Sequence, residues 1–325
     1  MQEELLNNTS VVTEDENIDD LFKLVELDER ESEHIAAEPY SYWKSVLRVF
    51  IKKPAAIISL VCLVVLIFGI VFIPMMVPAG YLSEFENIAI KNQAPSAAHI
   101  WGTDLIGRDV FFLCWIGAGK SLGLALISSF VVLIIGTVFG LIWGFFKKLD
   151  RLFIEIYNLF VNIPSLLIYM LLSTIFSTAF PTVSVEARLV FALTLTGWIG
   201  LARFVRNQVI IITNREYNVA SQTLATPPHR IMFKNLLPFI LSVIITDFSL
   251  TIPGMISSEV SMSYFGVGLP STDISIGALL EVGRKNFTLY PWQLLYPALL
   301  LALIIFIFFL MGLALTDALD PKKHR

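Results

Sequence analysis

The sequence has few of the groups that enzymes use for chemistry. It holds only two cysteines, Cys62 and Cys114, and Cys62 lies inside an apolar run, which argues against a disulfide framework or a cysteine-rich metal site. All four histidines lie outside the long apolar runs, so none can serve as a base or metal ligand within a membrane. They are His34, His99, His229 and His324. An intramembrane enzyme therefore has no evident catalytic residue here.

A complete phosphate-binding loop is also missing. Gly119-Lys120-Ser121 matches the end of the signature of nucleotide hydrolases, but Cys114 stands where its first glycine belongs. That loop also needs a preceding strand, so that its backbone N–H groups surround the phosphates. We therefore expect that the chain itself binds no ATP, no other cofactor and no metal.

Charge is scarce and unevenly distributed. Of the 325 residues 15% are charged and 56% hydrophobic, whereas a soluble domain has about 25% charged residues. Residues 1–40 hold 13 of the 27 acidic residues and only Lys23 and Arg30 as basic ones. We expect 1–42 to be an acidic, disordered cytoplasmic tail. The amino terminus lacks a basic segment followed by a short apolar one, so no cleaved signal peptide is expected, and nothing indicates nucleic-acid binding.

Long uncharged stretches predict helices that cross a membrane, which takes about 20 apolar residues. Five are long enough: 54–83, 121–146, 156–185, 286–316, and 235–258, which only Asp247 interrupts. A sixth, 189–202, is short and spans only if its helix continues through Arg203 and Arg206 toward Ile212. The fold class predicted is an all-α membrane protein with six spans.

The distribution of basic residues supports six spans with both termini inside. Basic residues favour cytoplasmic loops, and this topology places fifteen of them inside and six outside. Gly119–Ser121 then becomes the outer entrance of the second span, with Lys120 as an interfacial anchor. Pro164 and Pro253 are expected to kink their helices. The stripe Gly136, Gly140 and Gly144 favours internal helix packing over a subunit interface.

The largest inside loop, 215–240, reads REYNVASQTLATPPHRIMFKNLLPFI. It has no helix breaker until Pro227 and Pro228, and Val219, Ala220 and Leu224 can share one helix face. The loop resembles the E-A-A signature of permeases of ATP-binding-cassette (ABC) importers, in which a short helix docks on a cytoplasmic ATPase. The matching positions are Glu216, Tyr217, Ala220, Leu224, Ile231, Phe233, Leu237 and Pro238. Ser221 replaces the second alanine and Ala225 the glycine, and both remain small.

Two further motifs resemble the oligopeptide and dipeptide permeases of the OppC or DppC subgroup. The segment HIWGTDLIGRDVF contains G-T-D-x-x-G-R-D, formed by Gly102, Thr103, Asp104, Gly107, Arg108 and Asp109. Its glycines allow tight turns, and its aspartates can accept backbone N–H groups. Later residues at subgroup positions are Glu259, Ser263, Phe265, Gly266, Gly268, Gly277, Leu280, Asp317, Leu319, Asp320 and Pro321.

The resemblance covers about residues 43–323 and implies a type I importer permease. The organisation expected is an acidic tail (1–42), an amphipathic entry and first span (43–77), an extracellular segment (78–118), a five-helix core (119–317) with the coupling loop at 213–238, and a cytoplasmic end (318–325). The implied partners are a second permease, two ATPases that hold ATP and magnesium, and an extracellular peptide-binding protein, all at a bacterial cytoplasmic membrane. The implied substrate is an oligopeptide; dipeptides, nickel complexes and glutathione are the alternatives.

Ionisable residues within the expected spans are candidates for function, because burying a charge in a bilayer is costly. Asp247 either lines the peptide path or accepts hydrogen bonds structurally; in a stand-alone ion-coupled carrier, the rival from another class, it would be the cation site. The coupling loop argues against such a carrier. Glu259 is a second path candidate, although a brace for the glycine-rich turn after it is favoured. Arg203 and Arg206 either extend to lipid headgroups or pair with acidic groups near the loop.

Overall fold

The computed structural model describes residues 42–77, 88–270 and 273–319. Within these ranges the chain is helical, and its one extended pairing is an isolated bridge between Thr103 and Asp109. The all-α class is therefore confirmed. Nearly all of the expected acidic tail lies outside the described residues, as do Asp320 and Pro321.

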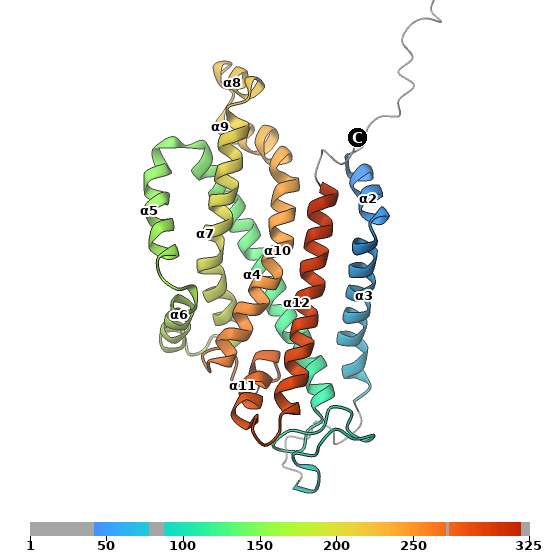
Figure 1. The fold of residues 1–325 in the computed structure, drawn as a ribbon. Helices are drawn as coiled ribbons and strands as arrows, with labels where there is room; N and C mark the ends of the chain where they lie inside the picture. Colours follow the sequence, from blue (N-terminus) through green and yellow to red (C-terminus); the bar gives the residue numbers. More distant parts are fainter. Residues whose placement is uncertain (1–41, 78–87, 271–272, 320–325) are drawn as a thin grey trace, which may run out of the picture. The chain divides into compact units, whose positions relative to one another are not determined.

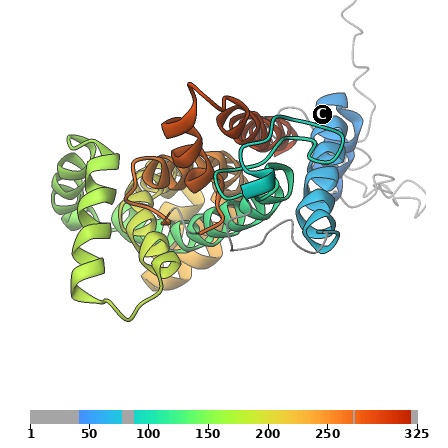
Figure 2. The same cartoon turned by 90° about the horizontal axis from the view of Figure 1, so that it is seen from below.

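The long helices run side by side, with α8 at one end of the bundle and α11 at the other (Figure 1). The helices are α2 (Tyr42–Lys52), α3 (Pro54–Met75), α4 (Val110–Phe145), α5 (Asp150–Val161), α6 (Ser165–Ala179), α7 (Val185–Thr213), α8 (Glu216–Thr223), α9 (Pro228–Arg230), α10 (Leu237–Tyr264), α11 (Ile276–Asn286) and α12 (Trp292–Leu319). Helix α10 packs on α4 and α12, and α12 on α3. Figure 2 shows α5 and α6 on one side of this bundle and α3 on the opposite side.

Five helical segments are long and apolar enough to cross a membrane: α3, α4, α7, Pro228–Tyr264 and α12. Helix α7 continues through Arg203 and Arg206 to Thr213, so the short fourth span does extend as the sequence required. The segment 228–264 is longer than the expected span 235–258 because π-helical backbone, Ile231–Leu236, joins α9 to α10. Pro253 lies inside α10, which continues past it.

The third expected span, 156–185, is wrong as a continuous helix. Helices α5 and α6 are bent by 91° relative to each other at a short break before Ser165. Pro164 explains the break, because proline donates no N–H and disfavours helical backbone in the residue before it. Helices of 12 and 15 residues reach only about 18 and 22 Å, so neither crosses about 30 Å of hydrocarbon unaided.

Helix α4 begins earlier than expected. The apolar pattern predicts the entrance of the second span near Gly119, but the helix begins at Val110 because the Asp109 side chain accepts the N–H groups of Phe111 and Phe112 at 2.9 and 3.4 Å. Such capping satisfies donors that have no partner within the helix. With 36 residues, α4 is about 54 Å long and extends beyond the hydrocarbon.

The most extensive helix packing joins α4 to α7, and the glycine stripe lies in this contact. A Cβ on Gly136, Gly140 or Gly144 would lie within 3 Å of a side-chain atom of Leu201, Val205 or Val209, respectively. The three glycines thus let the α7 side chains approach the α4 backbone. Internal packing, the favoured interpretation of this stripe, is confirmed.

We predict that Gly140→Ala destabilises the bundle by about 1–3 kcal/mol, the usual cost of overpacking. The added Cβ would lie 2.6 Å from the Val205 Cβ and 2.7 Å from the Ala202 carbonyl oxygen. The measurement is thermal unfolding in detergent, followed by size-exclusion chromatography. Gly123→Ala, on the same helix, is the matched control, because its Cβ would meet nothing within 4 Å. Equal stability of the two variants would contradict the packing argument.

Candidate functional site

Helix α8 is a short helix that projects from the end of the bundle (Figure 1). It ends before Pro227 and Pro228, through a Schellman turn: Thr226 N–H donates to the Ser221 carbonyl at 3.1 Å, and Ala225 N–H to the Gln222 carbonyl at 3.0 Å. Ala225 has a positive φ of 54°, the conformation that glycine adopts most easily. An alanine in this left-handed conformation costs about 1–2 kcal/mol. The replacement of glycine by Ala225 therefore affects how α8 ends, and not the flexibility of a hinge.

A buried asparagine attaches α8 to the membrane helices. Asn218 is fully buried, and its Nδ2 donates to the Ile212 carbonyl oxygen at 2.8 Å, in the last turn of α7. Asn235, in the π-helical segment, donates to Asn218 Oδ1 at 3.4 Å and to Ser221 Oγ at 3.3 Å. Neither asparagine was predicted from the sequence. The only signal for their role was that Asn218 is a polar residue on the face of α8 that turns toward the bundle.

The other face of α8 carries exposed apolar side chains. Leu224 is 81% exposed, and Tyr217 and Val219 are also exposed. Phe233 is exposed as well, whereas Ile231 is buried against the core. Of the remaining predicted positions, Glu216, Ala220, Ala225 and Pro238 are exposed, and Ser221 and Leu237 are half-buried. The predicted residues thus divide into an exposed set that can meet a partner and a smaller set that holds the loop.

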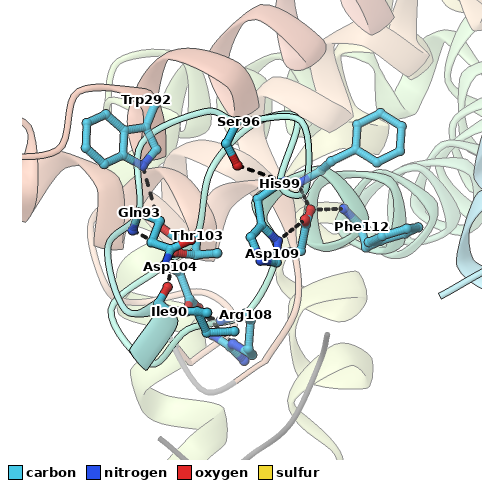
Figure 3. A network of polar contacts seen from close by, with 11 residues as sticks. Ile90, Gln93, Ser96, His99, Thr103, Asp104, Arg108, Asp109, Phe112 and Trp292 are labelled. Atoms are coloured by element: carbon cyan, nitrogen blue, oxygen red, sulfur yellow. Dashed lines mark hydrogen bonds and ion pairs between the residues drawn. The ribbon is translucent and has the colours of Figure 1, made fainter. Parts of the chain in front are cut away.

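The G-T-D-x-x-G-R-D segment lies at the end of the bundle away from α8 (Figure 1), and its polar groups form a compact network (Figure 3). Asp104 accepts the backbone N–H groups of Ile106 and Arg108 at 3.0 and 2.7 Å, and Arg108 Nε at 2.8 Å. Gly102 and Gly107 have φ of 74° and 95°, which is why glycine is needed at both turns. The hydrogen bonds expected of Asp104 and Asp109 are present.

Three residues that sequence reasoning did not assign complete this turn. His99 is buried, with Nδ1 2.8 Å from Asp109 Oδ2 (Figure 3), so this histidine orients the cap of α4. Gln293, at the start of α12, donates to the Thr103 carbonyl at 2.9 Å, and the Trp292 indole donates to the same oxygen at 3.4 Å. The motif therefore joins the beginnings of α4 and α12.

The path candidates lie in different surroundings on α10. Glu259 is fully buried, and its Oε1 accepts from Ser263 Oγ at 3.1 Å, while Ser263 Oγ accepts from Leu269 N–H at 3.1 Å. This chain of bonds has the geometry of a brace for the turn after α10, where Gly266 has a φ of 76°. Asp247 is half-buried in the middle of the helix.

Lys120 pairs with two carboxylates instead of acting simply as an interfacial anchor. Its Nζ lies 2.5 Å from Asp273 Oδ1 and 3.0 Å from Glu186 Oε1. These acidic residues belong to the segment before α11 and to the first turn of α7. Lys120 thus ties α4 to two other outer elements, a pairing that proximity in sequence could not indicate.

Arg203 and Arg206, near the other end of α7, differ in their contacts. Arg206 forms a two-pronged ion pair with Asp150, with Nη2 2.6 Å from Oδ1 and 2.8 Å from Oδ2. The Trp143 indole donates to the same carboxylate at 2.8 Å. Pairing with an acidic group therefore holds for Arg206, whereas Arg203 stacks over Tyr157 at 4.0 Å from the ring centroid.

Two family models match the chain. Residues 136–325 match "Binding-protein-dependent transport system inner membrane component", and residues 41–95 match "N-terminal TM domain of oligopeptide transport permease C". The matches together cover both ends of the membrane region, on either side of the outer motif.

Similar proteins include three curated transport permeases. The oligopeptide permease protein AmiD of Streptococcus pneumoniae is 37% identical over 94% of this chain and 97% of that protein. OppC of Bacillus subtilis is 34% identical over 91% and 94%, and the dipeptide permease protein DppC of the same species 33% over 94% of each. Among solved structures, an inward-facing MetNI methionine ABC transporter matches with a TM-score of 0.54 at 19% identity, covering 64% of this chain and 97% of that one, which supports the fold.

We predict that Asn218→Leu loosens α8, because it removes the hydrogen bond to the Ile212 carbonyl and one of the two that the Asn235 amide donates. Amide hydrogen exchange in the segment 216–226 should accelerate about tenfold, which corresponds to the loss of one buried hydrogen bond. Gln222→Leu, on the exposed side of the same helix, is the control and should leave exchange near Ile212 unchanged. Unaltered exchange in Asn218→Leu would show that the asparagine does not hold the helix.

Proposed function

Because this chain belongs to the family of binding-protein-dependent transport system inner membrane components, we propose that it is a transmembrane subunit of an ATP-driven oligopeptide importer. It forms the translocation pathway together with a second, different permease. The observation that carries the proposal is α8, a short helix with an exposed apolar face that is fastened to the ends of two membrane helices.

In this proposal α8 receives the motion of an ATPase subunit. Tyr217 and Leu224 supply the apolar contact, with Glu216 at the start of the helix. Asn218 then transmits the displacement to α7 directly and to α10 through Asn235. ATP and magnesium are held by two such ATPase subunits, and this chain acts through rigid-body movement of its helices rather than through catalysis.

The proposed orientation places α8 and both termini in the cytoplasm of a bacterial cell. The basic Lys147–Lys148 pair and Arg215 lie toward the same side as α8, in accord with the preference of basic residues for cytoplasmic loops. The outer motif, Gly102–Asp109, then faces the extracellular peptide-binding protein that delivers substrate. Oligopeptides are proposed because AmiD and OppC are named for them; the similarity to DppC makes dipeptides the main alternative.

Purification of the intact importer in mild detergent tests the proposal. The chain should co-purify with a second permease and two ATPase subunits, and the complex should hydrolyse ATP faster when peptide and the binding protein are added. Ala225→Trp should abolish most of this stimulation, because a bulky side chain in a left-handed turn displaces the end of α8.

The matched control for this experiment is Ala225→Gly. Glycine relieves the strain at the same position, so this variant should retain peptide-stimulated hydrolysis in full. Both variants should reach the membrane in equal amounts. Absence of ATPase subunits from the wild-type complex, or full stimulation in Ala225→Trp, would overturn the coupling role.

Asp247 is proposed to line the peptide path and to meet a cationic group of the substrate. Asp247→Asn should then reduce uptake of basic peptides about tenfold and leave neutral peptides less affected, since one charge interaction of about 1.4 kcal/mol corresponds to a factor of ten. Uptake of radiolabelled peptides of matched length measures this. Ser249→Ala, on the same helix, is the control, because its hydroxyl donates to the Ile245 carbonyl and not to Asp247. Equal uptake of both peptide classes by Asp247→Asn and wild type would remove Asp247 from the path.

A further inference from the structure

A cavity of about 750 Å³ lies beside α8, between the ends of α4 and α7. Its volume falls within the range of about 300–1,000 Å³ that is typical of small-molecule sites. Lys147 and Lys148, in the turn after α4, form part of its wall, and Val219 and Gln222 of α8 form another part. The cavity therefore touches the helix through which coupling is proposed to occur.

The wall of this cavity carries an uncompensated positive charge. Asp150 and Arg206 both line it, but they neutralise each other in the two-pronged ion pair described above. Lys147 and Lys148 are exposed, and neither has an ion pair with a carboxylate in the part of the chain that the structure describes. With two free ammonium groups at its edge, the cavity favours an anion.

A second hollow, of about 560 Å³, adjoins the same lysine turn. It shares Lys147, Lys148 and Asp150 with the first and adds Arg151 and Glu155, whose charges oppose each other. The acidic group that it adds is therefore offset by a basic one. Lys147 and Lys148 therefore line both cavities, so a ligand can reach both ammonium groups.

The remaining wall of the first cavity is mainly apolar, with Thr213 and Asn214 as its polar residues. Trp143, Phe145 and Phe146 come from the end of α4, and Ile210 comes from α7. This wall lies where α4 ends, a position at the inner membrane surface in the proposed orientation. A ligand with an anionic head and an apolar body fits both parts of the wall, and basic pockets between membrane helices on the cytoplasmic side are known to take anionic lipid headgroups.

We propose that this cavity binds an anionic phospholipid, with its phosphate at Lys147 and Lys148 and its glycerol and upper acyl region against the aromatic wall. The bound lipid contacts Val219 and Gln222 and so steadies α8. ATP hydrolysis and transport then depend on anionic lipid in the inner leaflet. This inference rests on the proposed orientation and coupling role.

The test uses the complete importer, reconstituted in nanodiscs of phosphatidylcholine with or without phosphatidylglycerol. In the wild type, phosphatidylglycerol should stimulate ATP hydrolysis several-fold, and native mass spectrometry should detect retained phosphatidylglycerol. The double variant Lys147→Gln/Lys148→Gln should bind this lipid roughly 30-fold more weakly and lose most of the stimulation, since each lysine near an anionic surface contributes about a factor of five.

The matched control removes two charges elsewhere on the same side of the membrane. Lys44→Gln/Lys52→Gln alters exposed lysines of α2, outside both cavities, and should keep lipid retention and stimulation. Equal loss in both double variants would show general electrostatic attraction and overturn the site. Stimulation by inorganic phosphate in phosphatidylcholine alone would assign the site to a free anion and also overturn the lipid proposal.

Two further outcomes separate this inference from the proposed function. Loss of the ATPase subunits from Lys147→Gln/Lys148→Gln during purification would show that the lysines belong to a protein interface, and would overturn the lipid site. Retention of phosphatidylglycerol by the wild type but not by the double variant would support the lipid site even if peptide failed to stimulate hydrolysis, a failure that would count against the proposed function alone.

Discussion

The close approach of α4 and α7 is the contact on which the other elements depend. In a bilayer, lipid tails are as apolar as leucine, so helices gain little from burying apolar surface against one another. Association must come from close contact, and Gly140 and Gly144 provide it by letting Val205 and Val209 reach the α4 backbone. Helix α8 follows the end of α7, and the G-T-D-x-x-G-R-D segment precedes the beginning of α4. The contact between α4 and α7 therefore positions both candidate functional regions.

Polar contacts then fix the orientation of the helices around the contact between α4 and α7. At one end of the bundle, Asp150 and Arg206 join the start of α5 to α7, and the Trp143 indole of α4 donates to the same carboxylate. Toward the other end, Lys120 connects α4 to the beginning of α7 through Glu186. The side chains of both pairs are partly exposed, so they set orientation at a lower desolvation cost than a fully buried pair would incur.

Much of this arrangement follows from the sequence by simple physical rules. Apolar length predicted four of the five segments that are long enough to cross a membrane, and the distribution of basic residues added the fourth span, α7. Small or turn-forming residues predicted the glycine stripe and the turn of the G-T-D-x-x-G-R-D segment. The rule of uncharged length failed at Pro164, because it counts apolar residues and takes no account of where the backbone can hydrogen-bond. The role of Asn218 stayed hidden for another reason: its partners, Ile212 and Asn235, are set by how three helices meet and not by helical periodicity. The partners of Lys120 were likewise beyond reach, since Asp273 is more than 150 residues away in the chain.

The length of α4 makes it a lever across the membrane. The helix begins at the cap of the outer motif and ends beside the lysine turn next to α8, a distance of about 54 Å along one continuous axis. If it tilts about its midpoint, its ends move in opposite directions by about half an ångström for each degree. In the proposed coupling, binding at the G-T-D-x-x-G-R-D segment and displacement of α8 therefore act on opposite ends of the same helix, α4. Communication between the two surfaces requires no chain of side-chain rearrangements through the bilayer.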